Sequence, residues 1–322
     1  RVKKTHEPIA ILKYDFTPES KKLKASATVL YRFGKNGYTA LDWYDAPDPR
    51  PDYYRNLPSY FFMDNTDYNR LNYSKYMWAK EQWEQDIPSI THINWDRLYA
   101  VNAMNSTADG NRSKYVIEER RTDQQDLNFA ANAKWSPVNC FTLAGGLSYK
   151  WNRTEYYKIL DDLLGGDYYV NIDQFAERDY ASSVTMYQND LDYYLKNGKA
   201  QTLKQGDKYG YDYYANVRRA EAWASGKFSK FGLDVALAGR IGYIKYWREG
   251  LLRKGLFPGL DANGQPMTYE GKVITTYDPI TGDAITSLGK SEVKDFLTGA
   301  AKLNVSYVIP GGHRVYANAA FI

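Results

Sequence analysis

The sequence has very few residues of the types that most often bind metals or form cross-links. It contains one cysteine, Cys140, and three histidines, His6, His92 and His313. A single cysteine excludes an internal disulfide, and the histidines lie too far apart to show the spacing of a metal site. We therefore expect neither a metal nor a cofactor.

Catalytic motifs are missing as well. The sequence contains no Gly-x-Ser-x-Gly, no His-Glu-x-x-His and no phosphate-binding loop. An acid–base pair of His92 and Asp96 is the one alternative, and three histidines give such chemistry little support. We predict that the protein is not an enzyme.

Excess charge and long apolar runs are also lacking. There are 42 basic and 38 acidic residues, a net charge of +4, and no dense basic run, so we expect no nucleic-acid partner. Mean hydropathy is −0.62, and no stretch of about 18 consecutive apolar residues occurs, which excludes transmembrane helices. A membrane β-barrel is not excluded, because only every second strand residue then meets lipid.

Aromatic residues, by contrast, are abundant. They make up 16% of the chain, and 31 of them are tyrosines. Amphipathic rings are typical of membrane interfaces and of wet ligand-binding surfaces.

Several segments alternate between apolar and polar residues, which indicates β-strands because successive side chains of a strand point to opposite faces. In residues 23–33 the apolar positions are Leu23, Ala25, Ala27, Val29, Tyr31 and Phe33. The pattern predicts eight strands, at residues 9–16, 23–33, 113–135, 141–152, 209–228, 233–247, 295–309 and from about 313 onwards.

Short turns and long loops join these strands in strict alternation. The three loops have roughly 79, 56 and 47 residues, whereas soluble domains rarely contain loops above about 12–15 residues. Short periplasmic turns and long extracellular loops are typical of an outer-membrane barrel. The fold class that we predict is all-β, a transmembrane antiparallel β-barrel of which this chain supplies about eight strands.

The position of the aromatic residues supports a membrane barrel. On the apolar face they gather at the turn end (Phe16, Trp135, Phe141, Phe228, Tyr307) and at the loop end (Tyr31, Phe33, Tyr149, Trp151, Tyr243, Trp247). A soluble sheet with one packed face would alternate too, but it has no reason to sort its aromatic residues to both ends. Charged residues occupy the other face, and we predict that Arg32, Lys150 and Arg240 line the lumen.

The first long loop carries the candidate ligand-binding residues. In residues 40–61 aromatic rings alternate with charged residues, and prolines stiffen the segment. The candidates are Trp43, Tyr44, Tyr53, Tyr54, Arg55 and Tyr60. The alternative is that these rings pack the loop into an ordered cap.

Acidic residues of the other loops raise the question of calcium. Asp161, Asp162, Asp167, Asp173 and Asp179 have no fixed ligand spacing. Asp261 begins a segment like the start of a calcium loop, but the downstream ligands are missing, which favours a plain turn.

Several segments resemble loops and strands of TonB-dependent outer-membrane receptors of the Bacteroidetes type. They are DWYDAPDPRPDYYRNLPSY (42–60), INWDRLY (93–99), DQFAERD (173–179), GLLRKGLFP (250–258) and GHRVYANAA (312–320). The resemblance implies a 22-stranded barrel with an amino-terminal plug, in the outer membrane of a Gram-negative bacterium. Residues 1–322 would be a partial barrel domain without the plug and without the closing strand.

The resemblance also implies a function and partners. The receptor would import a nutrient ligand with energy from the TonB complex, which acts on the plug region that this chain lacks. Further expected partners are the lipid bilayer, lipopolysaccharide and a surface-exposed lipoprotein. Two alternatives stay open: a structural or adhesion barrel that binds a surface lipoprotein or a host molecule, and a soluble carbohydrate-binding β-protein.

Overall fold

The computed structural model describes residues 1–62 and 73–321, and these form two compact units. We call the first the loop unit; it comprises residues 39–119 and 158–210 together with Arg1. The second, the sheet unit, comprises residues 2–38, 120–157 and 211–322. Each unit is described by itself below.

The eight predicted strands are confirmed. They are β2 (Ile9–Phe16), β3 (Leu23–Trp43), β6 (Tyr115–Val138), β7 (Phe141–Asp162), β10 (Lys208–Lys230), β11 (Leu233–Gly250), β15 (Lys294–Ile309) and β16 (His313–Phe321). With β1 (Lys3–His6) and β14 (Gly289–Lys290) they form a ten-stranded sheet in the order β1-β3-β6-β7-β10-β11-β15-β16, in which β2 also pairs with β3 and β14 with β11. Chain neighbours are therefore sheet neighbours, as in an up-and-down arrangement.

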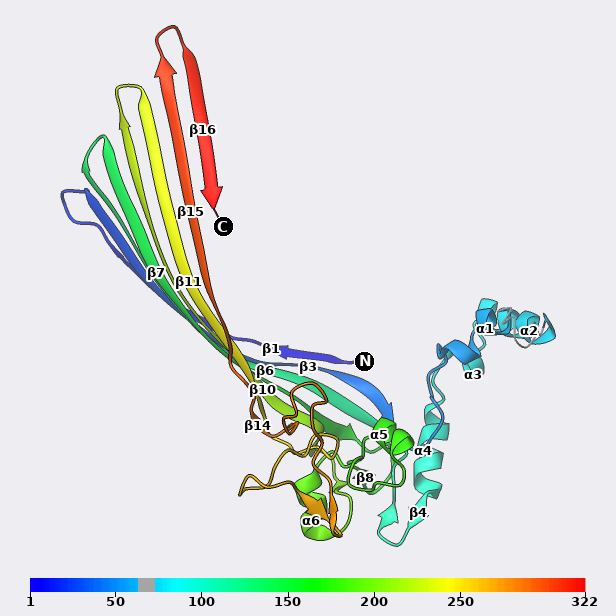
Figure 1. Ribbon diagram of the computed structural model, residues 1–322. Coiled ribbons are helices and arrows are strands. Elements are labelled where there is room, and N and C mark those ends of the chain that lie inside the picture. The colour runs from blue at the N-terminus through cyan, green and yellow to red at the C-terminus, as the bar shows by residue number, and fades with distance from the viewer. Residues whose placement is uncertain (63–72, 322) are drawn as a thin grey trace. The chain divides into compact units, whose positions relative to one another are not determined.

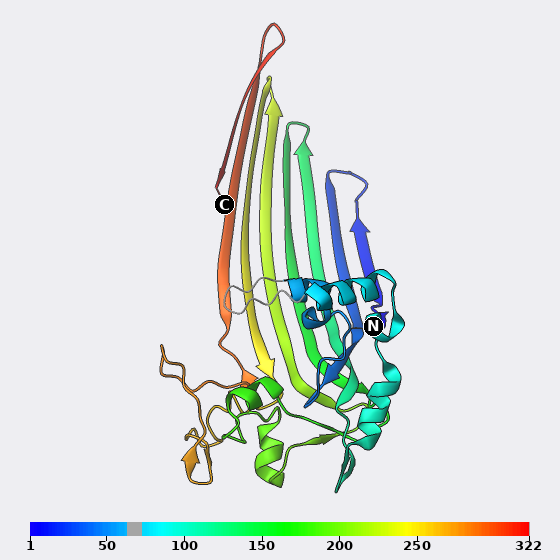
Figure 2. The ribbon, with the colours of Figure 1, turned by 90° about the vertical axis from the view of Figure 1, so that its right-hand side faces the viewer.

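The hairpin turns of the sheet unit lie at one end of the sheet (Figure 1). Figure 2 shows the hairpins side by side, each reaching further than the one before it from β2–β3 to β15–β16. Such a stagger accompanies the strand tilt that a barrel wall requires.

One edge of the sheet is a strand interrupted by a proline. Lys3 lies opposite Tyr38 and Ile9 opposite Arg32, so β1 and β2 pair with β3 in the same register. Between them the carbonyl of Pro8 accepts a hydrogen bond of 3.3 Å from the Phe33 amide, but proline has no N–H to donate in return. The ladder is therefore broken at this point without any change in register.

The sheet is open within the described residues. β1 and β2 pair only with β3, and β16 pairs only with β15. The closed barrel and its 22 strands therefore stay predictions.

The long loops contain helices that the period-two pattern did not predict. The helices are η1 (Tyr54–Asn56), α1 (Pro58–Phe62), α2 (Tyr73–Glu84), α3 (Pro88–Thr91), α4 (Trp95–Met104), α5 (Gln174–Asp179) and α6 (Leu191–Asn197). Short strands accompany them: β4 (Ser106–Thr107), β5 (Gly110–Asn111), β8 (Tyr169–Val170), β9 (Thr202–Leu203), β12 (Thr268–Tyr269) and β13 (Lys272–Val273). Residues 63–72 of the first predicted loop lie outside the described residues.

Side-chain caps explain where three of these helices begin. Asn94, Asp173 and Asp190 each accept backbone N–H bonds from the first turn of α4, α5 and α6, respectively. α6 ends at Gly198, which adopts the left-handed conformation that favours glycine. None of the helices in the described part of the chain is both long and apolar enough to cross a membrane.

The loop unit has its own hydrophobic core. Val116, Leu160 and Leu203 have no exposed surface and pack with Tyr169 and Tyr209. A second cluster joins α4 to strand β6 through Leu98, Tyr115 and Leu164. The long loops are therefore ordered around buried residues that come from both the loops and the strand ends.

Candidate functional site

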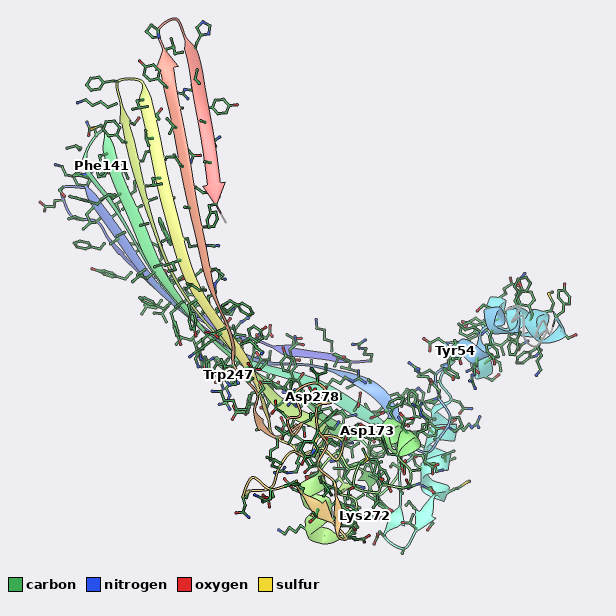
Figure 3. All side chains as sticks on the ribbon, in the orientation of Figure 1. Tyr54, Phe141, Asp173, Trp247, Lys272 and Asp278 are labelled. Atoms are coloured by element: carbon green, nitrogen blue, oxygen red, sulfur yellow. The ribbon has the colours of Figure 1, made fainter. Side chains whose placement is uncertain are left out.

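One face of the sheet unit is apolar and exposed. The strand register places Leu237 opposite Leu303, and Leu303 opposite Ala319, so the apolar positions of neighbouring strands share a face. Leu147 is 59% exposed and Leu297 is 73% exposed. Figure 3 shows side chains projecting from both faces along the strands, from Phe141 at a turn to Trp247 towards the other end of β11. The predicted sorting of the apolar positions onto one face is confirmed, whereas contact of that face with lipid stays a prediction.

The opposite face carries charged networks, and two predicted lumen residues meet in one of them. Arg32 donates to Gln124 at 3.1 Å and to Asp126 at 3.2 Å, and the ammonium of Lys150 lies 3.6 Å from the same Asp126 carboxylate. Gln124 in turn donates to Glu7 at 2.7 Å. This face therefore links β3, β6 and β7 through side chains as well as through the backbone.

The third predicted lumen residue lies in a separate network. Arg240 of β11 lies opposite Trp223 of β10, and its guanidinium is 3.8 Å from the carboxylate of Glu221, which also pairs with Arg219. Trp223 was not predicted on this face. It fits there because the facing position on β7 is Gly146, where a Cβ would come within 2.7 Å of the indole nitrogen.

Four of the six predicted ligand residues gather in the loop unit around η1 and α1. The rings of Tyr53 and Tyr54 meet edge to face with centroids 4.8 Å apart, and those of Tyr54 and Tyr60 with centroids 5.7 Å apart. Arg55 donates from Nε to the Tyr54 hydroxyl at 2.9 Å. Tyr54, labelled in Figure 3, is 53% exposed. We call these four residues the tyrosine cluster.

The other two predicted ligand residues lie elsewhere in the loop unit. Tyr44 is 8% exposed, and its hydroxyl donates to the carboxylate of Glu177 at 2.7 Å. Burial, followed by the bond to this carboxylate, raises the pKa of Tyr44 well above its ordinary value. Trp43 is half-buried against the α4 cluster, with Arg50 5.2 Å from its ring centroid. These two rings hold the loop together, as the cap interpretation expects.

A buried ion network was missed by sequence reasoning. The ammonium of Lys158 lies 2.9 Å from Asp42 and 2.8 Å from Glu118, and the hydroxyl of Tyr209 donates to the same two carboxylates at 3.0 and 3.1 Å. The four residues come from β3, β6, β7 and β10. Glu118 is fully buried. The network ties the four strand ends of the loop unit together.

Burial and the charges of the network shift the pKa values of its titratable groups. Burial alone would raise the pKa of Asp42, but the charge and hydrogen bond of Lys158, together with further hydrogen bonds such as that from Tyr209, outweigh it, and the pKa of Asp42 lies below its ordinary value. The pKa of Tyr209 lies well above its ordinary value because the ring is buried beside two carboxylates. Tyr209 therefore remains a hydrogen-bond donor at any ordinary pH.

The asparagine Asn102 was also missed. Its side chain accepts from the amides of Lys114 and Tyr115 and donates to three carbonyl oxygens, those of Tyr115, Leu163 and Leu164. It is fully buried. Nothing in the local sequence marks it, because its partners lie up to 62 residues away along the chain.

The acidic loop residues serve local structure. Asp173 caps α5, Asp167 accepts from the Asn111 amide at 2.7 Å, and Asp162 accepts from the Leu164 amide at 2.8 Å. Asp261 accepts from the amides of residues 263 and 265, as in a plain turn. The described part of the chain contains no group of three or more residues arranged to hold a metal ion.

Comparison with known proteins gives a limited result. None of the protein-family models matches the chain, and no curated protein matches it. Among solved structures, the chain is similar to the unliganded ferric citrate transporter FecA (TM-score 0.41, 9% identity, 98% of this chain and 27% of that chain). It is also similar to the open form of the ferric-catecholate import receptor Fiu from E. coli K12 (0.43, 9%, 99% and 35%) and to the copper transporter OprC (0.42, 9%, 98% and 31%).

The chain thus spans about one third of each of these structures. The TM-scores and identities are too low to assign a family. The function is therefore inferred from the faces of the sheet and from the loop unit.

Proposed function

We propose that the sheet unit stands in the outer membrane as part of a β-barrel wall, and that the full protein is a receptor that takes up a nutrient ligand. The observation that carries this proposal is the difference between the two faces of the sheet. One face exposes large apolar side chains with aromatic residues at both ends, and the other carries ion pairs such as Arg32–Asp126. Lipid on one side and a wet lumen on the other would satisfy both faces.

Exposure of the apolar face to water would be unfavourable. Leu12, Leu147 and Leu297 are each more than half exposed, and they belong to one continuous surface across the sheet unit. Soluble proteins rarely leave apolar patches beyond a few hundred Å² uncovered. A soluble carbohydrate-binding sandwich would cover this face with a second sheet, and no described residue of the sheet unit does so.

Ligand recognition belongs, in this proposal, to the tyrosine cluster of the loop unit. Tyr54 and Arg55 are exposed. Ring contacts with Tyr53 and Tyr60 hold Tyr54 in place, and Arg55 is held by its hydrogen bond to Tyr54. Preorganised rings bind ligands by stacking, and the guanidinium adds hydrogen bonds to polar groups. Glycans, peptides and chelates all fit this chemistry.

The energy source and the protein partners rest on the resemblance of the loop segments to TonB-dependent receptors. We include in the proposal a TonB complex that acts through a plug domain, and a surface lipoprotein that contacts the long loops. An adhesion barrel would share the membrane position and the loops, but it would not transport the ligand. Uptake therefore distinguishes the two functions.

Two measurements on the full-length protein test the proposal. Cell fractionation should place the protein in the outer membrane, and an unheated sample should migrate differently from a heated one on a gel. A protein found in the soluble fraction would contradict the membrane position. Growth of a deletion strain on single nutrient sources would then test transport, and unchanged growth on every source would favour adhesion.

A further inference from the structure

An arginine lies on the apolar face of the sheet, level with the aromatic residues of the loop end. The guanidinium carbon of Arg218 is 4.8 Å from the ring centroid of Trp151 and 5.2 Å from that of Trp247. Its Nη1 atom donates to two backbone carbonyl oxygens at 2.8 and 2.9 Å. In the described part of the chain no carboxylate pairs with Arg218, so its charge is fixed in place by neutral groups.

The surroundings of Arg218 carry a positive excess. The cations nearby are Arg153, Lys245 and Lys290, and the carboxylates are Glu155, Glu249 and Asp295. Glu249 lies 3.5 Å from Arg153, and Asp295 accepts a hydrogen bond of 2.9 Å from Tyr243. With Arg218 there are thus four cations and three carboxylates, and Glu249 and Asp295 already have partners, which leaves this part of the face suited to an anion.

A track of small residues leads from Arg218 towards the turn end along β10. On the apolar face β10 carries, in order after Arg218, Ala220, Ala222, Ala224 and Gly226. On the neighbouring strand Tyr243 lies opposite Ala220, Ile241 opposite Ala222, Gly239 opposite Ala224 and Leu237 opposite Gly226. Large side chains of β11 therefore border the small residues of β10, except at Gly239, where the surface is open.

The track from Gly226 to Ala220 opens onto two adjoining hollows of the apolar face, which have room for a long apolar chain. Two hollows of about 1290 Å³ and 440 Å³ share Leu147, Ala222 and Ile241 in their linings. The larger one extends across the sheet from β2 to β15 and includes Ala224 and Gly226, and the smaller one includes Ala220, the residue of this face that precedes Arg218 on the track. The track from Gly226 to Arg218 covers about 26 Å of strand. One leaflet of a bilayer has a hydrocarbon thickness of about 15 Å, so the track is long enough for one acyl chain even on a tilted strand.

We propose that this track and Arg218 form a binding site for one anionic membrane lipid. The acyl chain lies along Ala220–Gly226, and the phosphate accepts hydrogen bonds from Arg218 between its two tryptophans. This inference rests on the proposed membrane position and adds a specific lipid partner to it. Charge-assisted bonds to phosphate are strong in such partly dry surroundings.

Native mass spectrometry of the full-length protein tests the site, with phosphatidylglycerol as the probe. We expect wild type to retain the lipid, and Arg218→Ala to retain it about tenfold less, since a charged hydrogen bond is lost. Ala222→Phe fills the track without changing any charge and should give a similar loss. Arg219→Ala is the matched control, because its side chain pairs with Glu221 on the opposite face, and it should retain the lipid as wild type does.

Three results would overturn the lipid site. They are equal retention by Arg218→Ala and wild type, retention of a diacylglycerol of the same chain length as strongly as phosphatidylglycerol, and displacement of the lipid by inorganic phosphate alone. The same samples are compared heated and unheated on a gel. Heat-dependent migration with equal lipid retention refutes only the lipid site, whereas a protein without such migration refutes the membrane position itself.

Discussion

Replacing Lys158 by methionine should loosen the loop unit far more than a typical surface substitution. The ammonium of Lys158 is the cation between Asp42 and Glu118, at 2.9 and 2.8 Å, and Glu118 is fully buried. Removing one partner of a buried ion network leaves uncompensated charge, which costs about 3–5 kcal/mol. Tyr209 still donates to both carboxylates, so we expect the lower end of this range.

Hydrogen exchange at a buried amide measures this loss directly. The Leu160 amide donates to the Asp207 carbonyl at 3.0 Å within the loop unit. A loss of about 3 kcal/mol would raise its exchange by more than about 100-fold if exchange follows local opening. Lys196→Met, at an exposed position of α6, is the control and should change the local stability by less than about 0.5 kcal/mol. Exchange within about threefold of wild type in Lys158→Met would refute the reasoning.

The same amide should report a dependence on pH. The pKa of Asp42 is lower in the folded protein than its ordinary value of 3.8. Its contribution to stability is therefore fully present above pH 3.8 and is lost as the pH falls through the lower folded value. Corrected for intrinsic rates, exchange of the Leu160 amide should accelerate on acidification below pH 3.8 in wild type and less so in Asp42→Asn.

Three further substitutions test the faces, the tyrosine cluster and the sheet edge. Leu143→Lys should reduce assembly in membranes, because it places a cation on the apolar face just inside the turn-end aromatic residues, where a charge towards lipid is destabilising. Lys150→Leu should assemble, as heat-dependent gel migration would report, and equal behaviour of the two variants would refute the assignment of the faces. Tyr54→Ala should lower ligand uptake roughly threefold or more through lost stacking, with unchanged uptake removing the cluster from the proposal. Gly34→Val should detach β1 from β3, since a Cβ at residue 34 would lie 2.7 Å from the Glu7 Cα. Amide hydrogen exchange in Lys3–His6 should therefore rise, and unchanged exchange would show that β1 stays paired.

The turn ends of the strands could be predicted from the sequence, but the loop ends could not. β7 begins at Phe141 as predicted, yet it runs to Asp162 rather than to 152. Alternation marks a strand only where one face is apolar, and beyond the aromatic residues both faces carry polar side chains. Backbone pairing continues there regardless, because it depends on hydrogen bonds and not on side-chain polarity.

The buried ion network could be predicted only in part. Asp42 and Lys158 lie at even-numbered positions, as do the polar residues Arg32 and Lys150 of the same two strands. Had the predicted strands been continued to these positions, both residues would have been placed on the polar face. Their meeting with Glu118 depends on the register of strands joined by long loops, which no local pattern encodes. Likewise, the segment 42–60 contains both the exposed Tyr54 and the buried Tyr44. The local sequence does not show which of the two tyrosines is buried, because burial depends on packing against other segments.

Fluorescence quenching by brominated lipids shows whether the apolar face of the sheet meets lipid. In a Cys140→Ser background, a single cysteine at Leu147 or at the neighbouring Ser148 carries the fluorescent label, and the full-length protein is reconstituted in vesicles. We predict strong quenching of the label at Leu147 and weak quenching at Ser148, because neighbours on a strand point to opposite faces. Equal quenching at both positions, or none at either, would contradict this prediction.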